Sequence, residues 1–260
     1  MLIKKVIYKK EKKQFIEDLD REVTISKAKK YYIEDVNKDY HTEHGTINKE
    51  DLKKTKNKTN INNDNFYIID ASFIDTFKKL KKFAQTISIK DIGSIIAETG
   101  IGKDSVVIDA GTGSAALAIY LARFCKVVYS YDINEKHLEQ AKQNIIFTET
   151  KNIIIKNENI ETAKLPKSIA DLVVLDLPEP FRAIKNVKKT LKLGGFIVTY
   201  SPCITQTMQT NKTLEKEGFF IIRNFENIQR DWIVKEKKVR PETKNNIHTA
   251  FLTIARKIEE

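Results

Sequence analysis

The chain has 260 residues, of which 46 are Lys or Arg and 35 are Asp or Glu, so its formal net charge is +11. Its composition, 41% hydrophobic and 31% charged, is typical of a globular protein and excludes a disordered chain. No apolar run reaches the ~18 residues of a membrane span, no secretory signal is visible, and two cysteines are too few for a disulfide framework or a zinc ribbon. We therefore expect a cytoplasmic protein without a membrane partner or a metal.

The first third of the chain has no long helical period. Residues 1–40 are short mixed segments, residues 41–65 are polar and predict a loop, and residues 66–70 have the apolar content of a strand. We place a small N-terminal domain in residues 1–80.

From about residue 86, strands alternate with helices. Helices are predicted at 91–99, 114–123, 135–147, 183–191 and 205–217, and strands at 105–109, 126–131, 152–156, 171–176, 196–200, 219–225 and 249–255, with a turn at Gly194-Gly195. This alternation predicts an α/β fold whose mostly parallel sheet is covered on both faces. The last two strands have no predicted helix between them, which indicates an antiparallel hairpin at the sheet edge.

The basic residues gather in clusters at 4–13, 53–58, 78–82 and 235–244. Only seven of them are Arg, and a bias toward Lys, Ile and Asn would also raise the charge without any functional reason. Both explanations stay open at this point. Several separated clusters suit a large nucleic acid better than a small anion, because lysines neutralise many phosphates along a polyanion.

A glycine loop follows the predicted strand that ends at Asp109. Gly111 and Gly113 permit close backbone approach to a ligand, and the following helix start offers free N–H groups. The spacing also fits the dinucleotide fingerprint. However, Asp109 stands where a dehydrogenase usually has an apolar residue, which favours S-adenosylmethionine over NAD. Asp132, at the end of the next strand, can bind ribose hydroxyls in either case.

A second segment of interest, Asp176-Leu-Pro-Glu-Pro-Phe181, begins where the strand predicted at 171–176 ends. Ligands of open parallel sheets bind outside the carboxyl ends of the strands. The segment is therefore either an ordinary turn or the place where a carboxylate contacts an amine of the substrate.

Taken together, these motifs resemble the archaeal tRNA (adenine-N1)-methyltransferases that act on T-loop positions 57 and 58. The resemblance covers nearly the whole chain, and its most specific part is an Arg240-Pro pair ahead of His248-Thr-Ala-Phe-Leu. Other matching segments begin at His41, Glu50, Gln85, Lys90, Asp109, Asp176 and Tyr200. The resemblance implies a Rossmann-like class I S-adenosylmethionine-dependent methyltransferase domain in residues 81–260. It also implies a β-rich domain in residues 1–80 that contacts RNA, and a homotetramer that binds tRNA.

Site residues follow from the same resemblance. Asp176 is expected to be catalytic, because its carboxylate can accept a hydrogen bond from the adenine amine and raise the electron density at N1. The residues expected to bind the cofactor S-adenosyl-L-methionine are Gln85, Asp109, Gly111, Thr112, Gly113, Ser114, Ala115, Asp132, His137, Asn159, Ile160 and Asp176. The residues expected to bind the substrate are Pro178, Phe181, Tyr200, Arg240 and His248. A purely structural role stays open for Tyr200 and His248.

The chain departs from the family pattern at five positions. Ala115 replaces a glycine of the cofactor loop, and Asn159 replaces an acidic residue. Ser88 and Ile89 stand where the family has an aromatic residue and a proline, so base stacking falls to another side chain. Phe181 replaces a frequent Trp and keeps an aromatic surface.

Three alternatives remain. A methyltransferase of corrin precursors would share the glycine loop, but it would not need a basic N-terminal domain. A non-catalytic tRNA-binding subunit would keep the fold and lose the cofactor residues, which are present here. An NAD-dependent oxidoreductase fits the glycine spacing alone.

Overall fold

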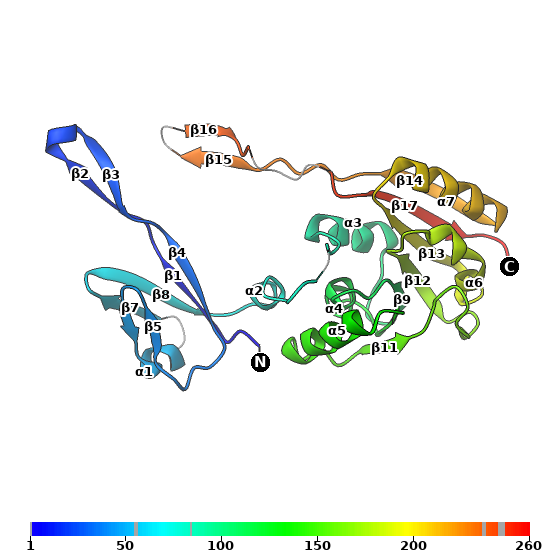
Figure 1. Cartoon of the computed structure of the whole chain (residues 1–260), viewed down its shortest axis with the longest axis horizontal. Helices are drawn as coiled ribbons and strands as arrows, with labels where there is room; N and C mark the ends of the chain where they lie inside the picture. The colour runs from blue at the N-terminus through cyan, green and yellow to red at the C-terminus, as the bar shows by residue number, and fades with distance from the viewer. Residues whose placement is uncertain (1, 55–56, 84, 236–237, 244–247) are drawn as a thin grey trace. The chain divides into compact units, whose positions relative to one another are not determined.

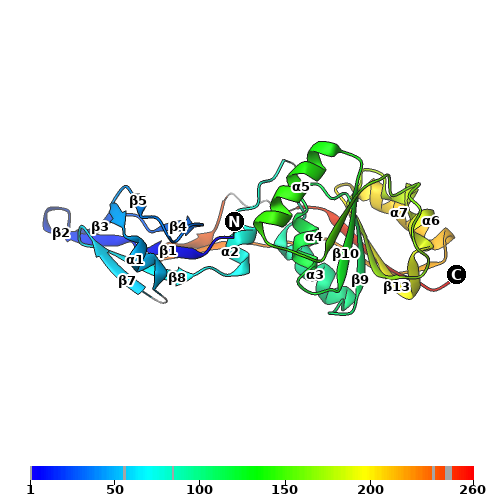
Figure 2. The same cartoon turned by 90° about the horizontal axis from the view of Figure 1, so that it is seen from below.

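The computed structural model describes residues 2–54, 57–83, 85–235, 238–243 and 248–260 (Figures 1 and 2). The chain divides into two compact units, one of residues 1–80 with 147–149 and one of residues 81–146 with 150–260. Of the basic clusters, Lys56, Lys237 and Lys244 lie outside the described residues.

The first unit is built on a four-stranded antiparallel sheet in the order β4-β1-β8-β7, with two further hairpins, β2-β3 and β5-β6. Its strands are β1 (Lys5–Lys9), β2 (Lys12–Ile16), β3 (Arg21–Ser26), β4 (Lys29–Ile33), β5 (Tyr40–Thr42), β6 (Gly45–Ile47), β7 (Asn57–Ile61) and β8 (Asp64–Asp70). Its helical turns are η1 (Glu17–Leu19), α1 (Lys49–Lys53) and α2 (Phe73–Phe77).

The prediction of a loop at residues 41–65 is wrong, because this segment holds strands and a short helix. Ile47 and Leu52 are fully buried and pack in one cluster with Ile7 and Phe66 of the sheet. Two buried apolar side chains, together with the partly buried Ile61, therefore anchor a segment whose other residues are mostly polar. A composition that is polar on average hides such anchors.

The lysines of the first basic cluster, residues 4–13, differ in exposure, because some of them lie on the covered face of the sheet. Lys5 and Lys9 point to the covered face, are buried, and form ion pairs with Asp70 (2.6 Å) and Asp64 (3.4 Å) respectively. These two lysines therefore stabilise the fold, since a buried ammonium needs a partner. Lys10, in contrast, is exposed.

The second unit holds the remaining elements. Its helices are α3 (Ile89–Thr99), α4 (Ala116–Leu121), α5 (Glu135–Phe147), η2 (Pro180–Arg182), α6 (Ile184–Lys188) and α7 (Ile204–Lys216). Its strands are β9 (Val106–Ala110), β10 (Val127–Asp132), β11 (Ile153–Asn157), β12 (Ala170–Leu175), β13 (Leu191–Ser201), β14 (Phe219–Phe225), β15 (Trp232–Lys235), β16 (Lys238–Pro241) and β17 (Phe251–Lys257).

Seven of these strands form one sheet in the order β11-β10-β9-β12-β13-β17-β14, in which only β17 runs antiparallel to its neighbours. Figure 2 shows α3, α4 and α5 on one face and α6 and α7 on the other. The predicted α/β fold is therefore confirmed. The chain order reverses between β9 and β12, and ligands of such sheets bind at the strand ends beside this reversal.

Most boundaries in this unit differ from the predictions by one or two residues, and three differences have a structural interest. Helix α4 begins at Ala116 rather than 114, because Ala115 adopts a left-handed backbone with φ +60. Helix α6 ends at Lys188, earlier than predicted. Strand β13 begins at Leu191 and runs through Gly194 and Gly195, whose predicted turn is instead an irregularity in the pairing with β12.

The predicted antiparallel pairing at the end of the chain is confirmed, since β14 and β17 pair antiparallel. Strand β17, however, lies between β13 and β14, so β14 is the edge strand. The connection from β14 to β17 also holds the hairpin β15-β16, which the sequence did not predict.

Candidate active site

The glycine loop lies against the end of β12. Gly111 has φ +96, and a Cβ atom at this position would lie only 2.1 Å from the backbone oxygen of Asp176. Gly113 has φ +50, but the nearest atom to its Cβ would be 3.9 Å away. Gly111 is thus required by both conformation and space, whereas Gly113 is required by conformation alone.

Hydrogen bonds fix this loop to the end of β10. The backbone N–H groups of Gly111 and Thr112 donate to the Tyr131 carbonyl at 2.9 and 3.1 Å. The Gly113 N–H donates to Asp132 Oδ2 at 3.0 Å, and His137 Nδ1 lies 3.2 Å from the same oxygen. The carboxylate of Asp132, at the end of β10, therefore fixes the loop through the Gly113 N–H. His137 contacts the same carboxylate.

Asp109 lies behind the loop and is 1% exposed. Its Oδ2 accepts a hydrogen bond from Ser130 Oγ at 2.6 Å, and Thr112 Oγ1 lies 2.7 Å from that hydroxyl. Its Oδ1 is buried and has no hydrogen-bond partner among the described residues. Burial, together with the negative charges of Asp176 and Asp132, raises the pKa of Asp109 to about 7, although the bond from Ser130 lowers it. An unpaired buried oxygen of this kind is suited to a cationic or donating ligand group.

Asp176 borders a small cavity of about 30 Å³, on the loop side of the sheet edge. Burial raises the pKa of Asp176 to about 7. The predicted residues that line this cavity are Gln85, Gly111, Thr112, Gly113, Ser114 and Asp176. Five predicted residues from two separate segments are thus brought together around the Asp176 carboxylate.

A second cavity, of about 200 Å³, lies on the β10–β11 side and shares Gly111 with the first. The other predicted residues that line it are Asp132, Asn159, Ile160 and Pro178. Asn159 Oδ1 accepts from the Glu161 N–H at 2.9 Å, which fixes the turn after β11. Gln206 Nε2 donates to the Pro178 carbonyl at 2.9 Å, which ties the loop after β12 to α7.

Several predicted residues do not line these two cavities. Ala115 is fully buried at the start of α4, and Phe181 packs against the hydrophobic core of the sheet. Arg240 lies on β16, where Nη1 donates to the Pro241 carbonyl at 3.0 Å. Any contact of Arg240 with substrate would therefore be made from the β15-β16 hairpin, since Arg240 is not part of either cavity wall.

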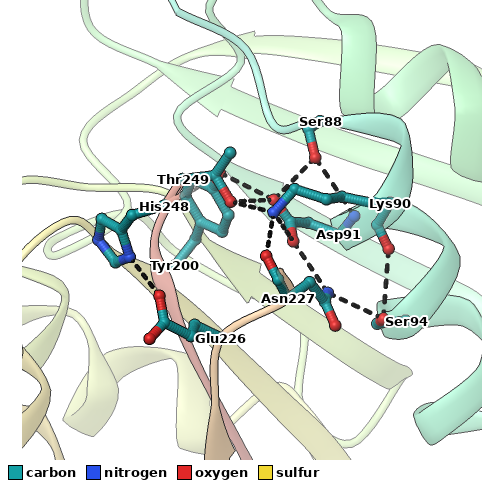
Figure 3. Close-up of polar contacts among 9 residues, drawn as sticks. All are labelled: Ser88, Lys90, Asp91, Ser94, Tyr200, Glu226, Asn227, His248 and Thr249. Carbon is teal, nitrogen blue, oxygen red and sulfur yellow. Dashed lines mark hydrogen bonds and ion pairs between the residues drawn. The ribbon is translucent and has the colours of Figure 1, made fainter. Parts of the chain in front are cut away.

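Tyr200 and His248 belong to a polar cluster beside the sheet edge (Figure 3). Tyr200 is 7% exposed, and its hydroxyl donates to Asp91 Oδ2 at 3.2 Å. His248 is exposed; its Nδ1 lies 2.6 Å from Glu226 Oε2, and its Nε2 lies 3.2 Å from the Pro202 carbonyl. Hydrogen bonds to Glu226 and to the Pro202 backbone raise the pKa of His248. Both predicted substrate residues are thus engaged in contacts within the protein.

Asp91, at the centre of this cluster, is a residue that the sequence reasoning missed. It is 0% exposed and follows Ser88, whose hydroxyl donates to Asp91 Oδ2 at 2.9 Å and caps α3. The position of Ser88, where the family has an aromatic residue, therefore serves as a helix cap here. A signal was present, because Asp91 lies on the same helical face as the buried Ile95, and a carboxylate on an apolar face needs buried partners.

Comparison with known proteins identifies the family. A family profile described as "tRNA methyltransferase complex GCD14 subunit" matches residues 67–251. The chain belongs to this tRNA methyltransferase family. It is 32% identical over 247 residues to the tRNA (adenine(57)-N(1)/adenine(58)-N(1))-methyltransferase TrmI of Methanocaldococcus jannaschii, covering 84% of this chain and 87% of that protein. The resemblance inferred from the motifs is thereby confirmed.

Two solved structures share the fold of this GCD14-family chain. TrmI of Aquifex aeolicus, a tRNA (m1A58) methyltransferase, superimposes with a TM-score of 0.78 over 99% of this chain and 98% of its own, at 21% identity. A SAM-dependent O-methyltransferase of Thermotoga maritima gives a TM-score of 0.79 over 99% and 94%, at 24% identity. The fold is therefore that of S-adenosylmethionine-dependent methyltransferases.

None of the helices among the described residues is long and apolar enough to cross a membrane. In the same part of the chain, no three His, Cys, Asp or Glu side chains gather as the ligands of a metal ion do.

Proposed function

We propose that this chain transfers a methyl group from S-adenosyl-L-methionine to N1 of the T-loop adenosine at position 58 of tRNA, or at both 57 and 58. The observation that carries this proposal is the buried Asp176 carboxylate against the glycine loop, in a chain that matches the GCD14 family along most of its length. The family match disfavours the corrin-precursor and oxidoreductase alternatives. The complete set of loop carboxylates disfavours a non-catalytic subunit.

The residues at the sheet edge fit the cofactor. The unpaired Oδ1 of Asp109, buried behind the loop, would attract the positive ammonium end of the amino acid of the cofactor. Asp132 offers carboxylate oxygens for ribose hydroxyls, and Asn159 and Ile160 border the roomier cavity that suits an adenine ring. Gln85, Thr112 and Ser114 would complete the loop wall, Ala115 would support the loop from behind, and His137 would act through Asp132.

Asp176 can promote methylation without transferring a proton. The bound cofactor supplies an electrophilic methyl group. The ionised Asp176 carboxylate accepts a hydrogen bond from the N6 amine of adenine, which raises the electron density at N1. It then stabilises the positive charge that methylation leaves on the ring. Fixing the base beside the cofactor can supply roughly 7–11 kcal/mol of the barrier. Drawing the nucleotide out of its stack costs a few kcal/mol.

The first unit supplies an RNA-binding surface in this proposal. One row across its sheet, on the face opposite the core, reads Lys30, Tyr8, Tyr67 and Lys58 on β4, β1, β8 and β7. Lys58 lies 5.9 Å from the centroid of the Tyr67 ring, and Lys10 lies 5.1 Å from the same centroid. Aromatic rings that hold lysines in this way support binding of a nucleic-acid backbone.

Self-association is the other partner proposal. The hairpin β15-β16 places Trp232, Val234 and Val239 on one face, and these side chains are 55%, 74% and 67% exposed. A two-stranded hairpin is marginal in water unless its apolar face is covered. This exposure supports an interface with another copy, and we propose the homotetramer that the family resemblance implies.

Methyl transfer to tRNA transcripts tests the function. Labelled S-adenosylmethionine is supplied with an unmodified tRNA transcript and with the same transcript whose T-loop adenosines are guanosine. We expect label on the first transcript only, and none with the Asp176→Asn variant. Equal labelling of both transcripts would move the site elsewhere in the tRNA, and label on neither would overturn the proposal.

A further inference from the structure

A buried carboxylate, Asp91, joins four segments that are far apart in the chain (Figure 3). Its Oδ2 accepts hydrogen bonds from the hydroxyls of Ser88 (2.9 Å), Thr249 (2.7 Å) and Tyr200 (3.2 Å). Its Oδ1 accepts from Asn227 Nδ2 at 2.9 Å. The two oxygens thus receive four donors, and the donors come from α3, the end of β13, the segment after β14 and the segment before β17.

The cation beside Asp91 reaches the same segments. Lys90 Nζ lies 3.5 Å from Asp91 Oδ1, donates to Thr249 Oγ1 at 2.8 Å and donates to the Asn227 carbonyl at 2.5 Å. Its side chain is 15% exposed. Although burial by itself raises the pKa of Asp91, the hydrogen bonds from Asn227, Thr249 and Ser88 lower it, so the carboxylate is ionised. Buried ion pairs are weak sources of stability, and in some proteins they fix one arrangement of their neighbours, which is the role that the bonds of this pair suggest.

These segments converge on the cavity that contains Asp176. Ser88 directly follows residues 85–87, which line that cavity. Strands β12 and β13 are in register at Leu175 and Thr199, so Asp176 and Tyr200 are the next residues at the same level of neighbouring strands. The cluster therefore lies beside two walls of the cavity.

The cluster also holds both ends of the connection that carries β15-β16. That connection leaves the sheet after Phe225 and returns to it at Phe251, which pairs with Ser201 at the ligand edge. Asn227 stands at the outgoing end and Thr249 at the returning end. Both ends are bonded to Asp91.

We propose that Asp91 is a positioning residue for methyl transfer: it fixes the 85–88 wall, Tyr200 and both ends of the 226–249 connection in one arrangement around Asp176. A base held between the 85–88 wall and Tyr200 then meets the Asp176 carboxylate in a fixed geometry. The inference rests on the proposed function, because it assigns to Asp91 a role in the same reaction. Asp91 touches neither reactant and acts through Ser88 and Tyr200.

The Asp91→Asn variant is the test, since it keeps the shape and removes two acceptor positions. The matched control is Asp171→Asn. Asp171 lies at the amino end of β12, away from the ligand edge, and accepts from the Val106 N–H (2.8 Å) and from Lys192 Nζ (2.6 Å). Each variant is assayed as the full chain at a temperature where circular dichroism shows it fully folded. Single-turnover transfer to an unmodified tRNA transcript is measured at saturating cofactor, along with the dissociation constants of cofactor and tRNA.

We expect Asp91→Asn to slow single-turnover transfer by roughly tenfold to a hundredfold, because small misplacements have effects of this size. Both dissociation constants should stay within about threefold, and Asp171→Asn should keep the wild-type rate. Equal slowing by both variants, or a loss explained by cofactor affinity alone, would overturn the role of Asp91.

Hydrogen exchange separates this inference from the proposed function. Asp91→Asn should speed exchange in peptides covering residues 85–92 and 249–252, and Asp171→Asn should not. If the wild-type chain methylated no tRNA, the proposed function would fail, whereas unchanged exchange in these peptides would overturn the coupling itself.

Discussion

The contact between Gly111 and the end of β12 makes a quantitative prediction for the Gly111→Ala variant. An alanine there would adopt φ +96 and place its Cβ 2.1 Å from the Asp176 carbonyl oxygen. The left-handed backbone costs roughly 1–2 kcal/mol for a residue with a side chain. Overpacking against a backbone atom that cannot rotate away costs roughly 1–3 kcal/mol more. We therefore expect Gly111→Ala to lower the free energy of unfolding by about 2–5 kcal/mol.

Gly113→Ala is the matched control, because it tests the conformation without the contact. Gly113 has φ +50, and its new Cβ would have no neighbour closer than 3.9 Å. Only the backbone cost of roughly 1–2 kcal/mol applies. Ala115→Gly should act in the opposite direction, since Ala115 already carries a side chain at φ +60. Losing its buried methyl removes about 0.8 kcal/mol, so the net gain is at most about 1 kcal/mol.

Urea denaturation of the full chain, followed by far-ultraviolet circular dichroism, gives the free energies. Hydrogen exchange of the β9 and β12 amides reports the stability of the second unit separately from that of the first unit. Isothermal titration with S-adenosylmethionine should show weaker binding by Gly111→Ala, because the loop must move away from β12. Equal destabilisation by Gly111→Ala and Gly113→Ala would refute the reasoning, since it would mean that the loop does not touch Asp176.

Three further predictions concern charge. Asp176→Asn should abolish transfer yet raise the melting temperature at pH 8. Because the pKa of Asp176 is raised from 3.8 to about 7, the protonated carboxyl stabilises the fold at low pH, and this stability is lost as the pH rises through about 7. At pH 8 the buried carboxylate is therefore destabilising, and a neutral amide removes that cost. Cofactor binding near pH 7 should release protons from Asp109 and Asp176, visible as a buffer-dependent heat in calorimetry, and the uncharged product thioether should release fewer. Lys58→Gln should reduce the slope of the logarithm of tRNA affinity against the logarithm of salt concentration by about 0.9, whereas Lys49→Gln, on the α1 side of the same unit, should leave this slope unchanged. A reduced slope for Lys49→Gln alone would exclude the sheet face that carries Tyr8, Tyr67 and Lys58 as the RNA contact.

The fold of the second unit could be predicted from the sequence because the patterns that indicate its helices and strands are local. Strands β9, β10, β12 and β13 are apolar runs followed by helical stretches. Helix α5 and strand β14 match their predicted bounds, 135–147 and 219–225. Asp109, Asp132 and Asp176 each stand at or next to the end of a predicted strand, and the carboxyl ends of parallel strands meet at one edge of a sheet, so the sequence indicates their common edge. Several ends were still misplaced by two or more residues, among them the starts of α3, α4 and β13 and both ends of β17.

The first unit and the Asp91 cluster could not be predicted in the same way. Strands such as β5 and β6 have three residues each, too few for a period to emerge from polar surroundings. Asp91 meets Tyr200, Asn227 and Thr249 across 109, 136 and 158 positions of sequence. Partnerships at that separation follow from the order of strands in the sheet, which places the end of β13 and both ends of the 226–249 connection at one edge.

Asp109 and Asp176, at the carboxyl ends of the parallel strands, differ from Asp91 in α3 in how their charge is balanced. Asp91 is satisfied by four hydrogen-bond donors and a lysine, so it is ionised and its charge is balanced within the protein. Asp109 keeps an unpaired buried oxygen, and burial holds the pKa of both Asp109 and Asp176 near 7. Because stability alone would favour amides or apolar residues at these two positions, the presence of carboxylates there is best explained by ligands that carry positive charge. A cationic cofactor and a base that becomes cationic on methylation meet that requirement at the two places where the structure leaves negative charge uncompensated.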